Sequence, residues 1–316
     1  MKAGTQFCRL MKFVNRLFLF LACLFSGITL RAQVTVTGAA NTTPALAATY
    51  TSLANAITAL NNITAISGPV TISLTAGNPQ TAPAGGYSIQ FSATTTAVNN
   101  ISIVGNSNVI TASNTHTAGS RTDALFKLIG VDFITLRNFT LQENAANTTT
   151  AVATNNMTEW GVALLYASTT NGAQNNTIRN NTISLNKTYG STFGIYSNSN
   201  HTLAAPTTSA PVTATTGTNS NNKFYSNAIS NVNMGIALIG CQDVNFMDTG
   251  NDVGGSSAAT GNTITNWGGL VQTTSYASST GTCYGINSDN QKDENISFNT
   301  ITSAAVSGTT VTMRGI

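Results

Sequence analysis

Short runs in which apolar residues alternate with Thr, Ser or Asn recur along the chain and predict strands. In the run Gly68–Leu74, the apolar residues Val70, Ile72 and Leu74 stand at every second position, which is the period of a strand with one buried face. The densest alternation lies at 133–141. Asn, Gly and Ser separate these runs, and they are typical of turns. The pattern therefore predicts an all-β protein of short strands and sharp bends.

A repeated phrase places a hydrophobic residue two positions after an asparagine. The asparagines are separated by 46, 35 and 37 positions, close to the period of about 20 to 45 residues found in stacked solenoids. An asparagine at the bend of each coil can bond its equivalents above and below. We therefore predict a structural ladder, although asparagine is also common in the loops of a chain rich in Asn, Thr and Ser. The pairs are Asn181 with Ile183, Asn227 with Ile229, Asn262 with Ile264, and Asn299 with Ile301.

One segment near the start has a helical period instead. In Tyr50–Asn62, the residues Leu53, Ala56, Ile57 and Leu60 fall on one helical face, and Thr51 or Ser52 can cap its start. A stacked solenoid must cover the open end of its first coil. We therefore predict a leader at 33–49, a capping helix with its connection at 50–67, and stacked strands at 68–316.

These phrases, together with VDFITLRNFTLQ at 131–142 and NNISIVGNSNVITAS at 99–113, resemble the pectate-lyase-like fold. The version that they resemble is carried by secreted and surface proteins of Bacteroidetes-type bacteria, and the similarity spans about Tyr50 to the end. It implies a right-handed parallel β-helix solenoid. The resemblance does not extend to active sites, because the chain lacks paired aspartates, Gly-His-Gly and Arg-x-Lys in the expected order. Because 309–316 still reads as strand, we expect coils to continue beyond Ile316.

The first 32 residues are typical of a secretory signal peptide. A basic flank from Lys2 to Arg16 precedes nine apolar residues at 17–25, and a small residue ends the segment before Gln33. Nine residues are too few for a membrane span, which needs about 20. We predict cleavage between Ala32 and Gln33, export to the cell surface or the medium, and no membrane span in the mature chain.

Cleavage changes the charge of the chain. It removes five of the 13 basic residues and none of the ten acidic ones, so the mature chain carries 8 − 10 = −2. The remaining basic residues are scattered in sequence, which argues against a nucleic-acid partner. Cys241 and Cys283 are the cysteines left after cleavage. In an exported protein they can form a disulfide or remain two buried thiols, and the sequence leaves both open.

Two groups of acidic residues are candidates for chemistry. Asp243, Asp248 and Asp252 could bind calcium, but their spacings of five and four do not match an EF-hand loop, and an ordinary turn is the favoured interpretation. The second group could supply an acid and a base for glycoside cleavage, although charges before a strand more often solvate a turn. It consists of Asp289, Lys292, Asp293 and Glu294.

The histidines and aromatic residues give weaker signals. His116 and His201 lie in loops rich in Thr, Ser and Ala, without the pattern of metal ligands. We therefore predict no metal, no cofactor and no catalytic residue. Trp267, Tyr276 and Tyr196 are candidates for a platform on which sugar rings stack, and core packing is the alternative. Trp267 stands between Asn266 and two glycines, so we expect it to be exposed.

The leading hypothesis is an exported β-helical protein with a structural, adhesive or glycan-binding role. Its partner would be a polysaccharide or a glycan on a host or cell surface. The alternative is a polysaccharide lyase or glycoside hydrolase whose active residues lie partly beyond Ile316. Fold alone cannot separate these two functions.

Overall fold

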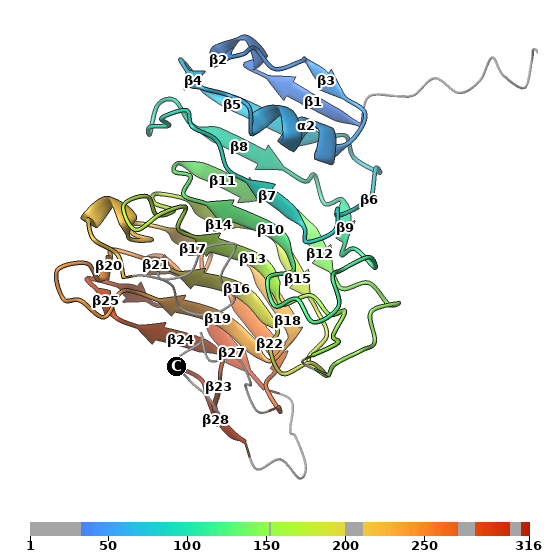
Figure 1. Ribbon diagram of the computed structural model, residues 1–316. Coiled ribbons are helices and arrows are strands. Elements are labelled where there is room, and N and C mark those ends of the chain that lie inside the picture. The colour runs from blue at the N-terminus through green and yellow to red at the C-terminus, as the bar shows by residue number, and fades with distance from the viewer. Residues whose placement is uncertain (1–32, 152, 200–210, 271–281, 304–310) are drawn as a thin grey trace, which may run out of the picture. The chain divides into compact units, whose positions relative to one another are not determined.

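Each turn of the chain contributes one strand to each of three sheets, and successive turns stack in register (Figure 1). This computed structural model describes residues 33–151, 153–199, 211–270, 282–303 and 311–316. The predicted signal peptide up to Ala32, the candidate Tyr276 and His201 lie outside these ranges.

The strands of the three sheets are as follows. Sheet 1 contains β1 (Val34–Thr37), β3 (Thr49–Tyr50), β5 (Val70–Leu74), β8 (Ile101–Val104), β11 (Ile134–Arg137), β14 (Thr177–Arg179), β17 (Lys223–Tyr225), β21 (Asp252–Val253) and β26 (Asn295–Ile296). Sheet 2 contains β6 (Gln80–Thr81), β9 (Val109–Thr111), β12 (Thr140–Gln142), β15 (Thr182–Ser184), β18 (Ala228–Val232), β22 (Thr263–Trp267) and β27 (Thr300–Thr302). Sheet 3 contains β7 (Tyr87–Ile89), β10 (Ala124–Ile129), β13 (Trp160–Leu165), β16 (Phe193–Asn198), β19 (Met234–Ile239) and β24 (Ile286–Asp289).

Smaller elements complete the described chain. Three two-stranded sheets pair β2 (Thr42–Thr43) with β4 (Ala65–Ile66), β20 (Asp248–Thr249) with β25 (Gln291–Lys292), and β23 (Thr282–Tyr284) with β28 (Thr312–Arg314). The helices are η1 (Ala39–Asn41), α2 (Leu53–Leu60) and η2 (Thr215–Gly217). The protein is thus mostly β, as predicted, and its long parallel sheets are compatible with a β-helix.

Stacked columns of aliphatic side chains fill the interior. In sheet 2 the second residue of each strand from β9 to β22 points inward and pairs in register with its counterpart in the next coil. Burying each such side chain stabilises the fold by about 1.5 to 3 kcal/mol. A register shift of one residue would point the inward side chains of a whole strand toward solvent. The apolar alternation therefore fixes the register of the stack. The column consists of Ile110, Leu141, Ile183, Ile229 and Ile264, all at most 1% exposed.

Helix α2 forms where the sequence predicts it. The Ser52 hydroxyl caps its first turn by accepting a hydrogen bond from Asn55 N at 3.2 Å, and the predicted apolar face is buried. Just after the helix, the Asn61 side chain donates to Ser88 O at 2.8 Å and accepts from Gln90 N at 3.0 Å. The end of α2 is therefore bonded to β7, the outermost strand of sheet 3.

The prediction that 33–49 is only a leader is wrong. Strand β1 lies in sheet 1 and pairs antiparallel with both β5 and β3. Val34 and Val36 alternate with threonines, and their side chains are 0% and 8% exposed. This alternation satisfies the same rule as the later strands, so the first sheet begins immediately after Gln33.

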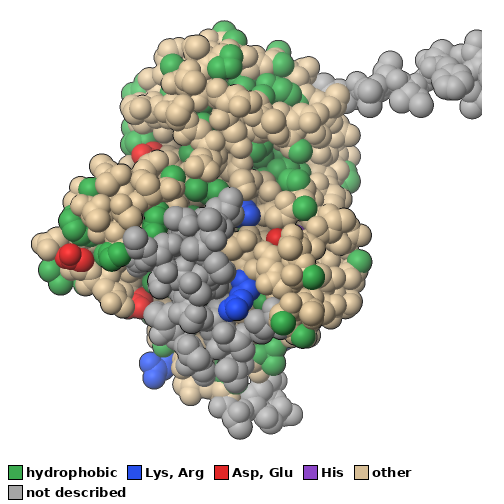
Figure 2. Space-filling view, in the orientation of Figure 1, with side chains coloured by type: hydrophobic (Ala, Val, Ile, Leu, Met, Phe, Trp, Pro, Cys, Tyr) green, Lys and Arg blue, Asp and Glu red, His purple; other side chains and the backbone are tan. Residues whose placement is uncertain are grey.

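The corners between sheets differ in length. Only two residues separate β11 from β12, β14 from β15 and β17 from β18. Between sheets 2 and 3 the chain instead makes loops at 112–123, 143–159 and 185–192. The strands β10, β13, β16 and β19 of sheet 3 are buried along their whole length. On the face shown in Figure 2, charged side chains are sparse.

Candidate functional site

Four asparagines form a hydrogen-bonded row at the corner between sheets 1 and 2. The side-chain Nδ2 of Asn181 donates to Oδ1 of Asn227 at 3.2 Å, Asn227 donates to Asn262 at 3.0 Å, and Asn262 donates to Asn299 at 2.8 Å. Each Oδ1 also accepts the backbone N–H of the coil before it. The structure thus brings the four predicted ladder residues together, and their amides satisfy buried backbone groups.

A second row, which the sequence analysis missed, lies where the chain enters sheet 1. Oδ1 of Asn176 accepts from Ile134 N at 2.9 Å, Asn222 accepts from Asn176 N at 2.9 Å, and Asn251 accepts from Asn222 N at 2.8 Å. Their Nδ2 groups bond backbone carbonyls in the preceding turn. The signal was present as the doublets Asn175-Asn176 and Asn221-Asn222. The first residue of each doublet has a positive φ of 57° or 58°, a conformation that asparagine tolerates well.

These left-handed residues open an elongated hollow on the outer face of sheet 1, which we call the groove. It has a volume of about 510 Å³ and spans several coils. Phe133 and Asn221 lie along one side, and the outward residues Thr135, Thr177 and Lys223 form its floor. These three floor residues are in register on β11, β14 and β17. Because neighbouring strands are about 4.8 Å apart, an extended ligand along the stack would meet a similar set of polar groups at each coil.

Basic side chains gather on this face of sheet 1. Arg137 and Arg179 are register partners on β11 and β14, and Lys223 follows on β17. Arg179 and Lys223 are exposed, and Arg137 is half-buried. Within the described part of the chain, none of the three has a carboxylate within ion-pair distance. Three of the eight basic residues after Gln33 therefore lie beside the groove without an ion pair, although they are scattered in sequence; one carboxylate, that of Asp252, is on the strand next to Lys223.

A smaller hollow of about 280 Å³ adjoins the groove and shares Asn221 with it. Apart from Met247, its lining is polar and uncharged. Asp132, next to the groove residue Phe133, accepts a hydrogen bond from Gln174 N at 2.7 Å. Burial raises the pKa of the Asp132 carboxyl to about 6, although that hydrogen bond opposes the shift. The two hollows together offer a mostly polar surface whose one charged lining residue is Lys223.

The described aromatic candidates do not form an exposed platform. Tyr196 is 0% exposed, and its ring stacks on Trp160 at 4.9 Å between centroids. Trp267 is 3% exposed, so the expectation that it is exposed is wrong. Its neighbours Asn266 and Gly268 both have positive φ. They turn the chain at a corner, while the indole at the end of β22 packs into the core.

The acidic residues of the first group do not form a metal site. Asp243 is exposed, whereas Asp248 is fully buried and accepts from Asn219 N at 2.9 Å. Asp252 accepts from the Tyr225 hydroxyl at 2.5 Å. Within the described ranges, no three or more His, Cys, Asp or Glu side chains are grouped so as to hold a metal ion.

The second acidic group lies at a turn beside sheet 1. Its members Asp289 and Glu294 are half-buried, whereas Lys292 and Asp293 are exposed. Asp293 has a φ of 53°. Burial raises the pKa of the Glu294 carboxyl, and a hydrogen bond from the Ser288 hydroxyl opposes this shift.

Cys241 and Cys283 are both free and buried. The Cys283 thiol donates to Leu270 O at 2.8 Å and to Asn233 Oδ1 at 3.2 Å. Burial raises the pKa of this thiol, which lowers its reactivity. Of the two alternatives left open by the sequence, the structure has the pair of buried thiols.

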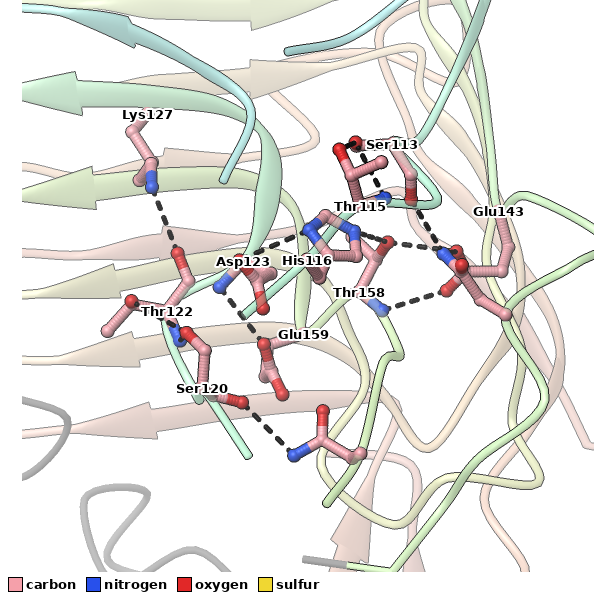
Figure 3. Close-up of polar contacts among 12 residues, drawn as sticks. Ser113, Thr115, His116, Ser120, Thr122, Asp123, Lys127, Glu143, Thr158 and Glu159 are labelled. Atoms are coloured by element: carbon pink, nitrogen blue, oxygen red, sulfur yellow. Dashed lines mark hydrogen bonds and ion pairs between the residues drawn. The ribbon is translucent and has the colours of Figure 1, made fainter. Parts of the chain in front are cut away.

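A cluster of charged residues also lies between the loops that join sheets 2 and 3 (Figure 3). His116, expected to be a solvated loop residue, has a side chain that is 0% exposed and lies 3.2 Å from Asp123. Glu159 is also 0% exposed, and burial, with Asp123 nearby, raises the pKa of its carboxyl well above the usual value. No pattern in the sequence indicates this cluster, because its members come from different loops.

No helix among the described residues is long and apolar enough to cross a bilayer. Comparisons of the chain with family models, with curated proteins and with solved structures gave no match.

Proposed function

We propose that this chain is an exported protein, secreted or held at the cell surface, that binds an acidic glycan along the groove of sheet 1. The observation that carries the proposal is the positive charge of Arg137, Arg179 and Lys223 beside that groove, none of which forms an ion pair with a described carboxylate. Carboxylate or sulfate groups of a polysaccharide would accept charge-assisted hydrogen bonds from these side chains. Repetition of coils about 4.8 Å apart suits a ligand that is itself an extended repeating chain.

The proposal includes the finer architecture that the sequence predicts. We infer a right-handed parallel β-helix of the pectate-lyase-like kind, as in surface proteins of Bacteroidetes-type bacteria, with α2 covering the first coil. The three parallel sheets and the bonds between Asn61 and β7 support this inference. Export rests on the signal-like residues 1–32, and sequencing of the secreted protein should begin at Gln33. A secreted form that retains residues 1–32 would contradict the cleavage.

Binding is tested by removing charge from the groove without changing the shape of the sheet. The variant Arg179→Gln/Lys223→Gln alters two exposed side chains. Its affinity for a polyuronate, measured by calorimetry or affinity electrophoresis, should fall about tenfold, since two exposed charge contacts contribute roughly 0.5 to 1 kcal/mol each. Binding of the unaltered protein should weaken with added salt and be absent for a neutral glucan.

The matched control is Lys187→Gln. This change removes one positive charge from a loop on the other side of the fold, where Lys187 bonds Asn266 at 2.6 Å. Its affinity for the polyuronate should equal that of the wild type. If the groove variant binds as tightly as the control, or if the unaltered protein prefers the neutral glucan, the proposed function is wrong.

Polysaccharide cleavage is the second candidate, and one observation favours it. Tyr225 is the register partner of Arg179 and donates to Asp252 at 2.5 Å, so a phenol, a carboxylate and a guanidinium share the ligand face. Asp252 also accepts from Gly255 N at 2.9 Å and from the Asn295 side chain at 2.7 Å, which is typical of a structural acceptor. If the wild type releases unsaturated products and folded Tyr225→Phe does not, cleavage rather than binding is the function of this face.

A further inference from the structure

The loops at 112–123 and 143–159, which join sheets 2 and 3 in successive coils, lie one on the other. We call them the upper and lower loops. Asn144 and Asn147 of the lower loop donate to Ala112 O at 3.0 Å and Ser113 O at 2.9 Å. Farther along, the Asn155 side chain donates to Ser120 O at 3.1 Å. Polar contacts rather than a shared apolar core thus hold the two loops together.

His116 lies at the centre of this contact (Figure 3). Its Nδ1 is 3.2 Å from Asp123 Oδ1, at the end of its own loop, and its Nε2 is 3.4 Å from Thr158 Oγ1, on the lower loop. The side chains of His116 and Asp123 are 0% and 5% exposed. The imidazole therefore bridges the two loops away from water.

The hydrogen bonds around Thr158 place a proton on Nε2 of the ring. The Thr158 hydroxyl donates to Glu143 Oε1 at 2.9 Å, so its oxygen is left to accept from Nε2–H of His116. Glu143 also accepts from Thr158 N at 2.9 Å and Asn147 Nδ2 at 2.8 Å. On the other side of the ring, Nδ1 is 3.2 Å from Asp123 Oδ1 but without the geometry of a hydrogen bond. His116 thus lies between two acidic residues, with Asp123 on one side and Glu143 beyond Thr158 on the other.

Other charged groups face the same contact. Glu159 Oε2 accepts from Asp123 N at 3.0 Å, and burial together with the Asp123 charge raises the pKa of the Glu159 carboxyl. Lys127, on β10, donates to Thr122 O at 3.0 Å. Burial lowers the pKa of the Lys127 amine to about 8, although Asp123 and Glu159 oppose the shift.

Two further groups, Tyr189 from the loop of the next coil and Arg121 from the upper loop, interact electrostatically at this place. Burial and the nearby Glu159 carboxyl raise the pKa of the Tyr189 phenol, and Arg121 partly opposes that shift. Around His116 there are thus three carboxyl groups, from Asp123, Glu143 and Glu159, with two further cationic side chains, Arg121 and Lys127.

We propose that His116 is a proton-operated latch, whose imidazolium holds the upper loop on the lower loop and whose deprotonation releases them. Loss of the proton removes one of the two ring donors, so either Asp123 or Thr158 loses its partner. It also leaves buried carboxylates without their bridging cation, which is costly. Imidazoles change charge between about pH 5 and 8, so the latch is closed in mildly acidic medium and opens as pH rises.

Glu159 acts in the same direction, and the sign follows from its raised pKa. Folding favours its protonated form, so its contribution is present at low pH and is lost as pH rises through the raised value. Release of the loops would expose the buried strands β10 and β13 of sheet 3 at their first residues, Ala124 and Trp160. The variant Glu159→Gln, which stays neutral and keeps an acceptor for Asp123 N, separates this contribution from that of His116.

Hydrogen exchange of the full chain between pH 5 and 8.5, corrected for the intrinsic pH dependence of exchange, tests the latch. The loops at 113–123, 143–151 and 153–158 should open more as pH rises, and in Glu159→Gln exchange of their amides should rise by up to tenfold per pH unit, the limit for one linked proton. Amides of the ladder corner at 178–183 should show no such change. The response should persist in Glu159→Gln. It should vanish when His116→Gln is added to Glu159→Gln, and the loops of that double variant should be open at every pH.

The other histidine supplies the matched control. His201→Gln should keep the full response and leaves His116 as the sole imidazole of the chain. In that variant, ¹⁵N spectra should show both ring nitrogens protonated while the loops are protected, with protonation and protection lost together. This measurement also applies if His116→Gln does not fold. Loops that open equally at all pH values, a response retained in the double variant His116→Gln/Glu159→Gln, or a neutral ring in the protected loops would overturn the proposal.

Discussion

Replacing the buried carboxyl of Asp248 by an amide should stabilise the protein at neutral and alkaline pH. Asp248 is 0% exposed, and its Oδ1 accepts from Asn219 N at 2.9 Å. One coil earlier, the Asn219 side chain plays the same part and accepts from Ala173 N at 2.8 Å. An asparagine at 248 would therefore keep the acceptor that the backbone needs, and it would carry no charge at any pH.

The magnitude follows from linkage. Burial raises the pKa of the Asp248 carboxyl from 3.8 to about 7, the nearby Glu294 adds to the shift, and hydrogen bonds from Asn219, Ser199 and Gln291 oppose it. Between these two values the folded protein keeps a proton that the unfolded chain has lost, so the free energy of unfolding falls as pH rises. The full difference of about three units corresponds to about 4 kcal/mol. We expect Asp248→Asn to recover roughly half, because its NH₂ group replaces an oxygen that accepts hydrogen bonds.

Urea unfolding at pH 4 and at pH 8 measures this effect. At pH 4 the wild type and Asp248→Asn should differ by less than about 1 kcal/mol, whereas at pH 8 the variant should be more stable by about 2 kcal/mol. Asp243→Asn removes a charge from an exposed position five residues earlier and should change neither value. If the stability of Asp248→Asn falls between pH 4 and 8 as steeply as that of the wild type, the buried carboxyl is not the group that titrates.

Two further predictions concern the ladder and the helix. Asn227→Ala removes an amide that bonds Ile178 O at 2.9 Å and Asn262 Oδ1 at 3.0 Å, and denaturant unfolding should show a loss of about 3 kcal/mol. Exposed Asn114→Ala should be neutral, and equal losses at both sites would contradict the ladder. Leu53→Asp places a charge at a position that is 0% exposed. The free energy of unfolding should fall by more than about 3 kcal/mol, and the variant should form oligomers in size-exclusion chromatography. Exposed Thr58→Asp should stay monomeric. Identical behaviour of the two variants would refute the covering role of α2.

Local patterns in the sequence predicted most of the strands and the helix. Alternation at Val70, Ile72 and Leu74, and the helical face around Leu53, depend on residues only a few positions apart. The ladder was visible for a related reason, because each asparagine keeps the same offset to an inward isoleucine. The same rule applied to Val34 and Val36 predicts β1, so the start of the first sheet was predictable from the sequence.

Contacts between loops could not be predicted in this way. His116 meets Thr158 across 42 positions, and the register that brings them together depends on loop lengths, which no periodic pattern encodes. Arg137, Arg179 and Lys223 look scattered in sequence and share a face only once the coils are stacked. Trp267 was misjudged because its polar neighbours reflect the backbone conformation of a corner, not the environment of the indole.

The corners between the sheets also determine where this protein can change length during evolution. At the corner between sheets 1 and 2, two residues connect the strands in three successive coils. One added residue beside Asn181 would point the inward side chains of the following strand toward solvent. At the corner between sheets 2 and 3, loops as different as 112–123 and 143–159 leave the stacked strands in register. Insertions and deletions should therefore accumulate at that second corner, which is also the place to graft a foreign peptide without disturbing the coils.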